Sequence, residues 1–269
     1  MTLGIPGGRQ VAGGSPEFEE TLWNAGATLE IVDGLTGYAS YSQGFTMADV
    51  GRILRGVSTP GQDVDTFLDV EPVVSDNQEL GLEYRAGPVS ASAAYFWSSS
   101  DRGSLLVLRN DVFEVQRQRT EIEGLELSAT WETPIEGLDI SGAYAMLEGE
   151  TDSDGDGAVD VDLDGANIGP DRLNLAVNYA VGPFAFRVQN QNYFDRSFDG
   201  DPAAGFDGYS IVDAFASYDT ELGVFTLAVA NAFDEQFVTY NTQTTRPTDN
   251  SRFFAGRGRV VTIGWQQDF

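Results

Sequence analysis

Hydrophobic and polar residues alternate along most of the chain in stretches of about ten residues. In one such stretch Leu173, Leu175 and Val177 alternate with Asn174 and Ala176. A period of two residues is typical of a β-strand, whose side chains point to opposite faces of the sheet. Each stretch therefore predicts a strand with one apolar face and one face of small or polar residues.

Short turns and long polar loops separate these stretches in regular alternation. We expect short turns at Asp33-Gly34, Gly87-Pro88, Pro134–Gly137, Val181–Pro183 and Glu221–Gly223, and long loops over 46–77, 149–170, 195–207 and 232–255. The predicted strands lie near 21–32, 36–45, 78–86, 89–99, 104–115, 117–132, 137–148, 171–181, 183–196, 208–220, 222–231 and 256–269. Segment 104–115 could instead belong to a loop, and Met47–Leu54 could form a helical turn. Short turns on one side and long loops on the other are typical of an up-and-down membrane barrel.

The second face of each strand decides between two kinds of all-β protein. It consists mostly of Ala, Ser, Gly, Asn and Gln rather than Lys and Glu. This composition fits a wet lumen, with the apolar face turned to lipid. Strands can cross a bilayer only when all backbone groups are paired around a closed ring. The predicted fold class is therefore an all-β, transmembrane, antiparallel up-and-down β-barrel. The alternative is a soluble, acidic all-β binding protein, secreted or at the cell surface.

Composition removes several functions from consideration. The chain has 269 residues with a net charge of −27, and it contains neither Cys nor His. The missing residue types exclude disulfide scaffolds, thiol catalysis, Ser-His-Asp relays and HExxH zinc sites. The negative charge argues against a nucleic-acid partner, which requires clustered Lys and Arg. No stretch is long and apolar enough for a transmembrane helix, and no signal peptide is visible after Met1. We expect a protein that is not an enzyme.

One acidic loop has the spacing of a metal site. Asp152, Asp154 and Asp156 precede Gly157, as in the first half of a calcium-binding EF-hand loop, and Asp160 and Asp162 follow. The twelfth position is Leu163 instead of the bidentate Glu that such a loop requires. The loop is therefore either a looser Ca²⁺ site, with no other cofactor expected, or a hydrated acidic hairpin loop. A calcium-dependent binding function would belong to the soluble alternative.

Several segments, in order, resemble the TonB-dependent receptors of bacterial outer membranes. They are Tyr41–Phe45 with Asp49–Gly51, Glu79–Tyr84, Arg119–Glu126, Gly208–Asp213, Val229–Glu235, Gly256–Arg259 and Gly264–Phe269. Together they cover the chain from about Thr21 to its end. Ser42–Arg55 and the strand that follows are most similar to the siderophore-receptor type.

The resemblance implies a function and a set of partners. Members of the family form barrels of about 22 strands closed by an N-terminal plug, bind iron–siderophore complexes, vitamin B12, haem or glycans, and receive energy through TonB. On this basis residues 1–20 are an irregular segment, and residues 21–269 form the C-terminal part of such a barrel. The expected partners are outer-membrane lipid, an iron–siderophore ligand, and either a missing barrel half or a second copy. TonB would act only through a plug that this sequence lacks, so the chain alone is not expected to transport.

Two further groups of residues follow from the resemblance. Val261, Ile263, Trp265 and Phe269 are similar to the signal by which the barrel-assembly machinery recognises its clients, although Gln267 departs from the apolar pattern. An ordinary edge strand at the end of the sequence would show the same pattern of alternating apolar residues. An anionic ligand would be gripped by scattered loop arginines, such as Arg52, Arg55, Arg102, Arg246 and Arg252, unless these are solvated charges.

Overall fold

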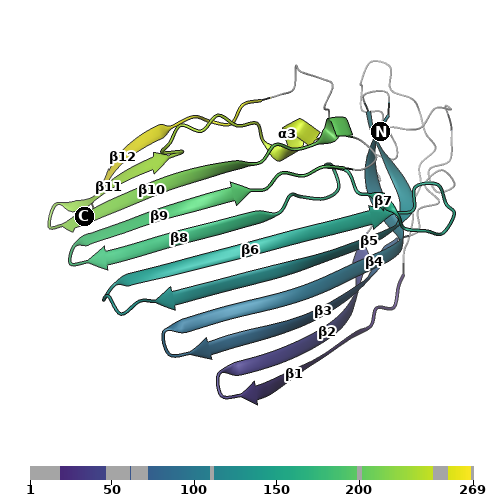
Figure 1. The fold of residues 1–269 in the computed structure, drawn as a ribbon, viewed down its shortest axis with the longest axis horizontal. Helices are drawn as coiled ribbons and strands as arrows, with labels where there is room; N and C mark the ends of the chain where they lie inside the picture. Colours follow the sequence, from purple (N-terminus) through teal and green to yellow (C-terminus); the bar gives the residue numbers. More distant parts are fainter. Residues whose placement is uncertain are drawn as a thin grey trace.

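The protein forms one strongly curved antiparallel sheet (Figure 1). The structure is a computed structural model that describes residues 19–46, 61, 72–109, 112–198, 202–244 and 254–267. Each strand pairs with its neighbours in the sequence, in the order β1-β2-β3-β4-β5-β6-β8-β9-β10-β11-β12, and the short β7 pairs with β6. Every connection is therefore a hairpin, as expected for an up-and-down barrel wall.

The strands are longest in the middle of the sheet, where β4 and β5 extend beyond their neighbours. Their bounds are β1 Asn24–Val32, β2 Leu35–Thr46, β3 Val73–Ala86, β4 Val89–Arg109, β5 Val112–Glu132, β6 Leu138–Thr151, β7 Val161–Asp162, β8 Arg172–Val181, β9 Phe184–Tyr193, β10 Tyr209–Thr220, β11 Gly223–Ala230 and β12 Val260–Gln266. A 3-10 turn, η2 (Pro202–Ala204), and the short helix α3 (Tyr240–Thr244) lie in the long loops. No helix among the described residues is long and apolar enough to span a membrane.

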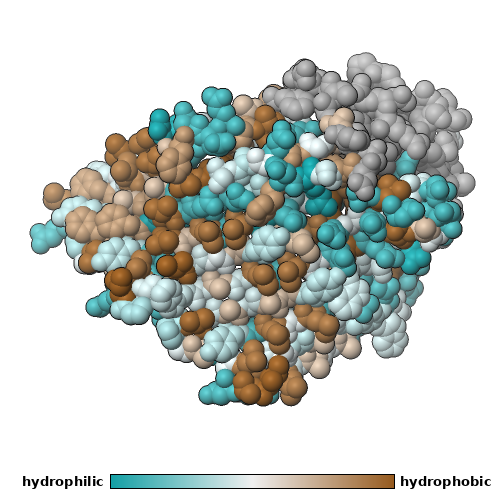
Figure 2. Space-filling model, in the orientation of Figure 1, coloured by the Kyte–Doolittle hydropathy of each residue, from teal (hydrophilic) through white to brown (hydrophobic). Residues whose placement is uncertain are grey.

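The register places the apolar residues of neighbouring strands on one face. Val177 lies opposite Val188, and Leu227 lies opposite Ile263. A hollow of the sheet lies on the other face, where Ser128, Asn174, Gln189 and similar residues line it. The polar face is therefore concave and the apolar face convex, as expected for a lumen and a lipid-facing wall. In Figure 2 hydrophobic residues are spread over the strands, and hydrophilic residues are dense beside the long loops.

The predicted strand at 104–115 is wrong as a separate element. Residues 104–109 continue β4, and residues 112–115 begin β5, so one long hairpin replaces three shorter strands. A bulge between Ser100 and Gly103 shifts the register and lets the hairpin continue through a stretch of polar residues. Backbone pairing here overrides local composition.

Other boundaries move for the same reason. Strand β3 begins at Val73, inside the segment assigned to a loop, because residues 73–77 pair with β2. Strand β6 continues to Thr151. The last strand covers Val260–Gln266, which is shorter than the predicted 256–269. The helical turn expected at Met47–Leu54 and most of the N-terminal segment 1–20 lie outside the described residues.

An arginine on the convex face should destabilise the assembled barrel far more than an arginine on the concave face. Leu227→Arg places a charge in lipid and should cost about 2–4 kcal/mol of unfolding free energy near the bilayer midplane. The neighbouring variant Ala228→Arg is the control, because Ala228 pairs with Phe215 and Thr262 on the other face. Urea unfolding of both variants in lipid vesicles measures the difference. Equal losses in the two variants would contradict the assignment of the faces.

Candidate functional site

The concave wall carries rows of mostly polar side chains across β6, β8, β9 and β10. One row is Ser141, Ala176, Gln189 and Asp213, and the row nearer the short turns is Asp139, Asn178, Arg187 and Phe215. Gln189 Nε2 donates a hydrogen bond to Asp213 Oδ2 at 3.1 Å, and Asn178 Nδ2 donates to Asp139 Oδ2 at 2.7 Å. These contacts join neighbouring strands and leave polar atoms toward the lumen, so this wall is suited to water.

Arginine is part of this network. The Arg187 guanidinium donates to Asn178 Oδ1 at 3.1 Å and to Gln189 Oε1 at 3.2 Å. The Asp213 carboxylate also accepts from the backbone amide of Asn231 at 2.8 Å, which links the wall to the start of the β11–β12 loop. The wall is thus rigidly organised through side-chain contacts between strands.

Above the wall, three of the long loops share one apolar core. Its buried members are Leu105, Leu163, Ile168, Phe198, Ala204, Phe206 and Tyr240, with Ile122, Leu147, Tyr193 and Tyr209 packed against it. The Tyr240 hydroxyl donates to the carbonyl of Ile168 at 2.8 Å, and burial raises the pKa of Tyr240 to about 12. The loops at the mouth are therefore held as one packed cap.

Asn231 fixes the chain where β11 enters the cap. It is buried, with a positive φ of 49°, and its amide nitrogen donates to the carbonyls of Glu235 and Arg257. Its side-chain oxygen accepts from the amide of Glu235 at 2.8 Å. Asn tolerates this left-handed backbone conformation better than most residues. The contact with Arg257 brings the chain back toward β12.

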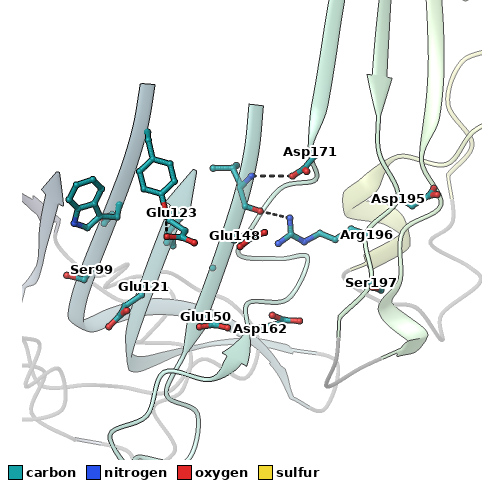
Figure 3. Close-up of a pocket in the computed structure, with 16 residues that line it drawn as sticks. Ser99, Glu121, Glu123, Glu148, Glu150, Asp162, Asp171, Asp195, Arg196 and Ser197 are labelled. Carbon is teal, nitrogen blue, oxygen red and sulfur yellow. Dashed lines mark hydrogen bonds between the residues drawn. The ribbon is translucent and has the colours of Figure 1, made fainter. Parts of the chain in front are cut away.

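Strands β6 and β8 separate near the loops, and side chains replace the lost backbone ladder. Their pairing ends at Ala145 and Arg172. Beyond that point the Leu147 amide donates to Asp171 Oδ1 at 3.2 Å, and Arg196 Nη1 donates to the carbonyl of Leu147 at 2.8 Å (Figure 3). Arg196 Nη1 also donates to the carbonyl of Gly169 at 2.9 Å. The gap borders a hollow of about 820 Å³ that Trp97 also lines. The separation is therefore stabilised, although it breaks the sheet.

Carboxylates meet tyrosine hydroxyls on the convex face near the loops. Tyr144 donates to Asp171 at 3.3 Å, and Tyr95 donates to Glu123. A ring with one apolar end and one wet end is typical of an interfacial belt of aromatic residues. The hydroxyl contacts place the polar end of each ring toward the loops.

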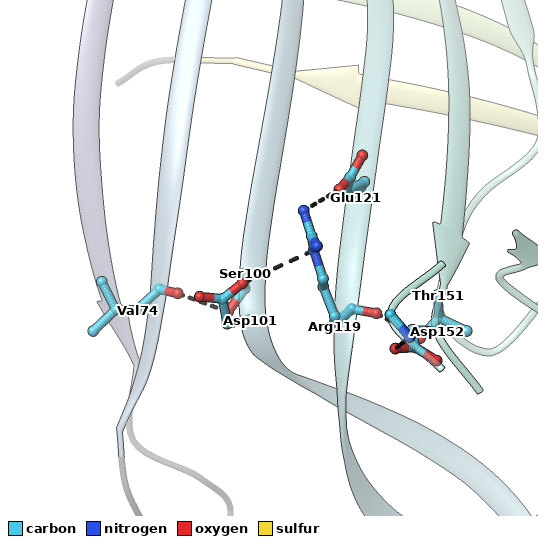
Figure 4. A network of polar contacts seen from close by, with 8 residues as sticks. Val74, Ser100, Asp101, Arg119, Glu121, Thr151 and Asp152 are labelled. Atoms are coloured by element: carbon cyan, nitrogen blue, oxygen red, sulfur yellow. Dashed lines mark hydrogen bonds and ion pairs between the residues drawn. The ribbon is translucent and has the colours of Figure 1, made fainter. Parts of the chain in front are cut away.

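A second polar cluster lies at the base of the β4–β5 hairpin (Figure 4). Arg119 Nη2 lies 3.0 Å from Glu121 Oε1, and Arg119 Nε lies 3.9 Å from Asp101 Oδ1. The carbonyl of Arg119 accepts from Thr151 Oγ1 and from the amide of Asp152. These contacts attach the acidic loop to the hairpin, and because the ion pairs are exposed they contribute little stability.

The structure brings together part of the expected metal site. Carboxylate oxygens of Asp152, Asp154 and Asp156 lie within 4.8 Å of one another, whereas Asp160 and Asp162 are not in this group. Backbone amides already bind the carboxylates: Asp152 accepts from Gly155 and Gly157. Such contacts also form in a turn without an ion. Calcium binding here stays a prediction.

The expected C-terminal signal is described except for its last residue. Val261, Ile263 and Trp265 lie on the convex face in register with Val229, Leu227 and Phe225, and Phe269 lies outside the described residues. The Trp265 indole donates to the carbonyl of Leu222 at 2.9 Å, which anchors the strand end at the last short turn. Recognition by the assembly machinery stays a prediction.

The loop arginines expected to grip a ligand are only partly described. Arg52, Arg55, Arg246 and Arg252 lie outside the described residues, and Arg102 lies on the β4–β5 hairpin. The sequence reasoning missed Arg172, whose side chain belongs to the concave face at the top of β8. Its alternation with Leu173 placed it on the polar face, but only the register shows which residues lie beside it.

Comparison with protein families gives a match over most of the chain. A family model described as "TonB dependent receptor-like, beta-barrel" matches residues 5–232. The chain is 25% identical over 243 residues to the ferric aerobactin receptor of Klebsiella pneumoniae, covering 85% of this chain and 32% of that protein. It is 23% identical over 285 residues to the rhizobactin receptor of Rhizobium meliloti (strain 1021), covering 96% and 36%. The chain spans about a third of the length of these relatives.

Solved structures show the same fold. The copper transporter OprC matches with a TM-score of 0.70 and 16% identity, over 88% of this chain and 38% of that chain. The ferric yersiniabactin uptake receptor FyuA from Yersinia pestis matches with a TM-score of 0.62 and 20% identity, over 90% and 35%. The curved sheet described here therefore corresponds to part of a larger barrel wall in each.

Removing the Arg196 guanidinium should loosen the separated ends of β6 and β8. Arg196→Met leaves two carbonyls without their donor, at a cost of about 1–3 kcal/mol in local stability. Hydrogen exchange around Leu147 and Gly169 should become faster, as read by mass spectrometry. Arg259→Met is the control, because Arg259 is exposed and its guanidinium, among the described residues, donates to one carbonyl, that of Ala232 at 3.3 Å. Unchanged exchange in Arg196→Met would show that the ladder is stable without this contact.

Proposed function

Because the chain belongs to the TonB-dependent receptor β-barrel family of the bacterial outer membrane, we propose that it forms the C-terminal part of the barrel of an iron–siderophore receptor. The relatives named as ferric aerobactin and rhizobactin receptors support a siderophore as the ligand. Family members are receptors and transporters, and the activity proposed for this chain is uptake.

One observation carries the proposal: the sheet has an apolar convex face and a concave face organised around side-chain amides. Gln189 and Gln191 both donate to the Asp213 carboxylate on the concave side. Leu227 and Ile263 face the opposite way. A wall of this kind separates lipid from a wide aqueous lumen. The soluble alternative would need a second layer to cover the apolar face, and nothing in the comparisons supports it.

Strand direction bears on how the barrel closes. Strands β1 and β12 both run from the long-loop end to the short-turn end. The path from β1 to β12 in the described sheet contains eleven strands, counting both edge strands. A second copy in the same membrane orientation would bring β12 beside β1 in parallel. Antiparallel closure instead requires a segment with an odd number of strands. This geometry favours completion by a missing barrel half over self-association.

The complete gene product should import ferric aerobactin in an energised manner. In an iron-limited bacterial strain without its own ferric aerobactin receptor, it should confer accumulation of radioactive iron from ferric aerobactin, and a TonB-deficient strain should lose it. The chain of residues 1–269, exported on its own, should give no energised uptake, because its open edges leave backbone groups unpaired in lipid.

Two results would contradict this proposal. Uptake that persists without TonB would indicate a passive channel. Energised uptake by residues 1–269 alone would show that the chain is a complete receptor. Heat-modifiable migration of the protein on gels serves as the control that each version is folded in the membrane.

A further inference from the structure

We infer that Arg172, with Tyr193 and Tyr209 beside it, forms the wall of the binding site for an anionic iron chelate. The inference rests on the proposed uptake function and names the charge of the ligand and the residues that hold it. These three residues occupy adjacent positions in the uppermost row of the concave wall, directly below the packed loop cap.

The register alone brings these residues together. Arg172 lies opposite Tyr193 in the β8–β9 pairing, and Tyr193 lies opposite Tyr209 in the β9–β10 pairing. Neighbouring strands are about 5 Å apart, so the three side chains form one continuous row. Asn174 and Gln191 lie in the next row down and offer amide groups just below.

The Arg172 side chain has no hydrogen bond or ion pair with any residue in the described part of the chain, and it is exposed. Other concave-face arginines differ: Arg85 lies 3.2 Å from Glu83, and Arg187 donates to Asn178 and Gln189. An arginine that holds a fixed structural contact has fewer donors left for a ligand than an arginine without one. The Arg172 fork keeps its donors for a carboxylate or a similar planar anion.

The aromatic part of the row is already rigid. The rings of Tyr193 and Tyr209 are tilted with centroids 4.7 Å apart, and the ring of Phe237 lies 4.4 Å from that of Tyr209. Phe206 meets Tyr209 edge-on at 5.8 Å. A surface fixed in this way loses little entropy when a ligand packs against it. It offers flat apolar area beside the charge of Arg172.

Carboxylates limit the site on its other side. Glu126 lies in the same row beyond Ala145, and the hollow of about 360 Å³ that Arg172 borders also contains the carboxylates of Glu79, Glu83 and Glu126. These like charges repel an anion from that side and leave Arg172 and the tyrosines as its contact. The arrangement therefore selects an anion with an apolar or aromatic part, held at one side of the lumen.

The test measures binding of ferric aerobactin to the complete gene product purified in detergent. Arg172→Gln should weaken binding about ten- to a hundredfold, since a hydrogen bond to a charged group is lost. It should also flatten the rise of Kd with added NaCl, because salt screens the contact. Arg172→Lys should restore part of the affinity, and Tyr193→Leu should weaken binding with the salt dependence kept.

Arg85→Gln is the matched control, because Arg85 lies on the same face near the short turns and already pairs with Glu83.

Unchanged or tighter binding by Arg172→Gln would overturn the inference. Weaker binding with an unchanged salt dependence and a lower melting temperature would also overturn it, since it would assign Arg172 a structural role. If the unaltered protein does not bind ferric aerobactin, that ligand is wrong for the proposed function. Binding is then measured for a panel of ferric chelates of known charge, and the charge of the chelates that bind decides the inference. Binding of only neutral or cationic chelates in that panel would then overturn it.

Discussion

Pairing of every backbone N–H and C=O group in hydrocarbon is the constraint on which this structure depends. An antiparallel ladder satisfies it, and the ladder runs without a crossover from β1 to β12. Because the ladder fixes which residues lie opposite one another, it also gathers the apolar residues on one face and the amides on the other. The edges at Asn24–Val32 and Val260–Gln266 are where the same constraint demands further strands.

The mouth of the barrel is built where this constraint is relaxed. Beyond the last β6–β8 pair, Asp171 and Arg196 bind the amide and carbonyl of Leu147 that the ladder no longer satisfies. Water and side chains can take over this role where the backbone does not face lipid. The loops can therefore leave the sheet there, pack around Phe206 and Tyr240, and form a cap that does not have to follow strand geometry.

Sequence alone predicts the parts of this architecture that are set by local alternation. The alternation of Leu175 with Ala176 assigns faces, and the glycines of the short turns mark hairpin ends, as the positive φ of Gly34 and Gly182 shows. The prediction of a separate strand over 104–115 is wrong because the pairing of β4 with β5 continues through a bulge that the alternation of residues does not reveal. Strand β10 shows a further limit: Phe215 faces the lumen and Ala216 the lipid, which only the pairing with β9 reveals.

The candidate site lies beyond sequence prediction for the same reason. Arg172, Tyr193 and Tyr209 belong to three strands, and a shift of the register by one residue would turn one of them to the opposite face. The acidic loop is evident in the sequence because its carboxylates alternate within a few residues, and two backbone amides of the loop donate to one of them, Asp152. Arg172, Tyr193 and Tyr209, in contrast, lie far apart in the sequence, and the Arg172 guanidinium keeps its donors for a ligand. In a barrel wall, a ligand site assembled by register is therefore harder to recognise from the sequence than a site concentrated in one loop.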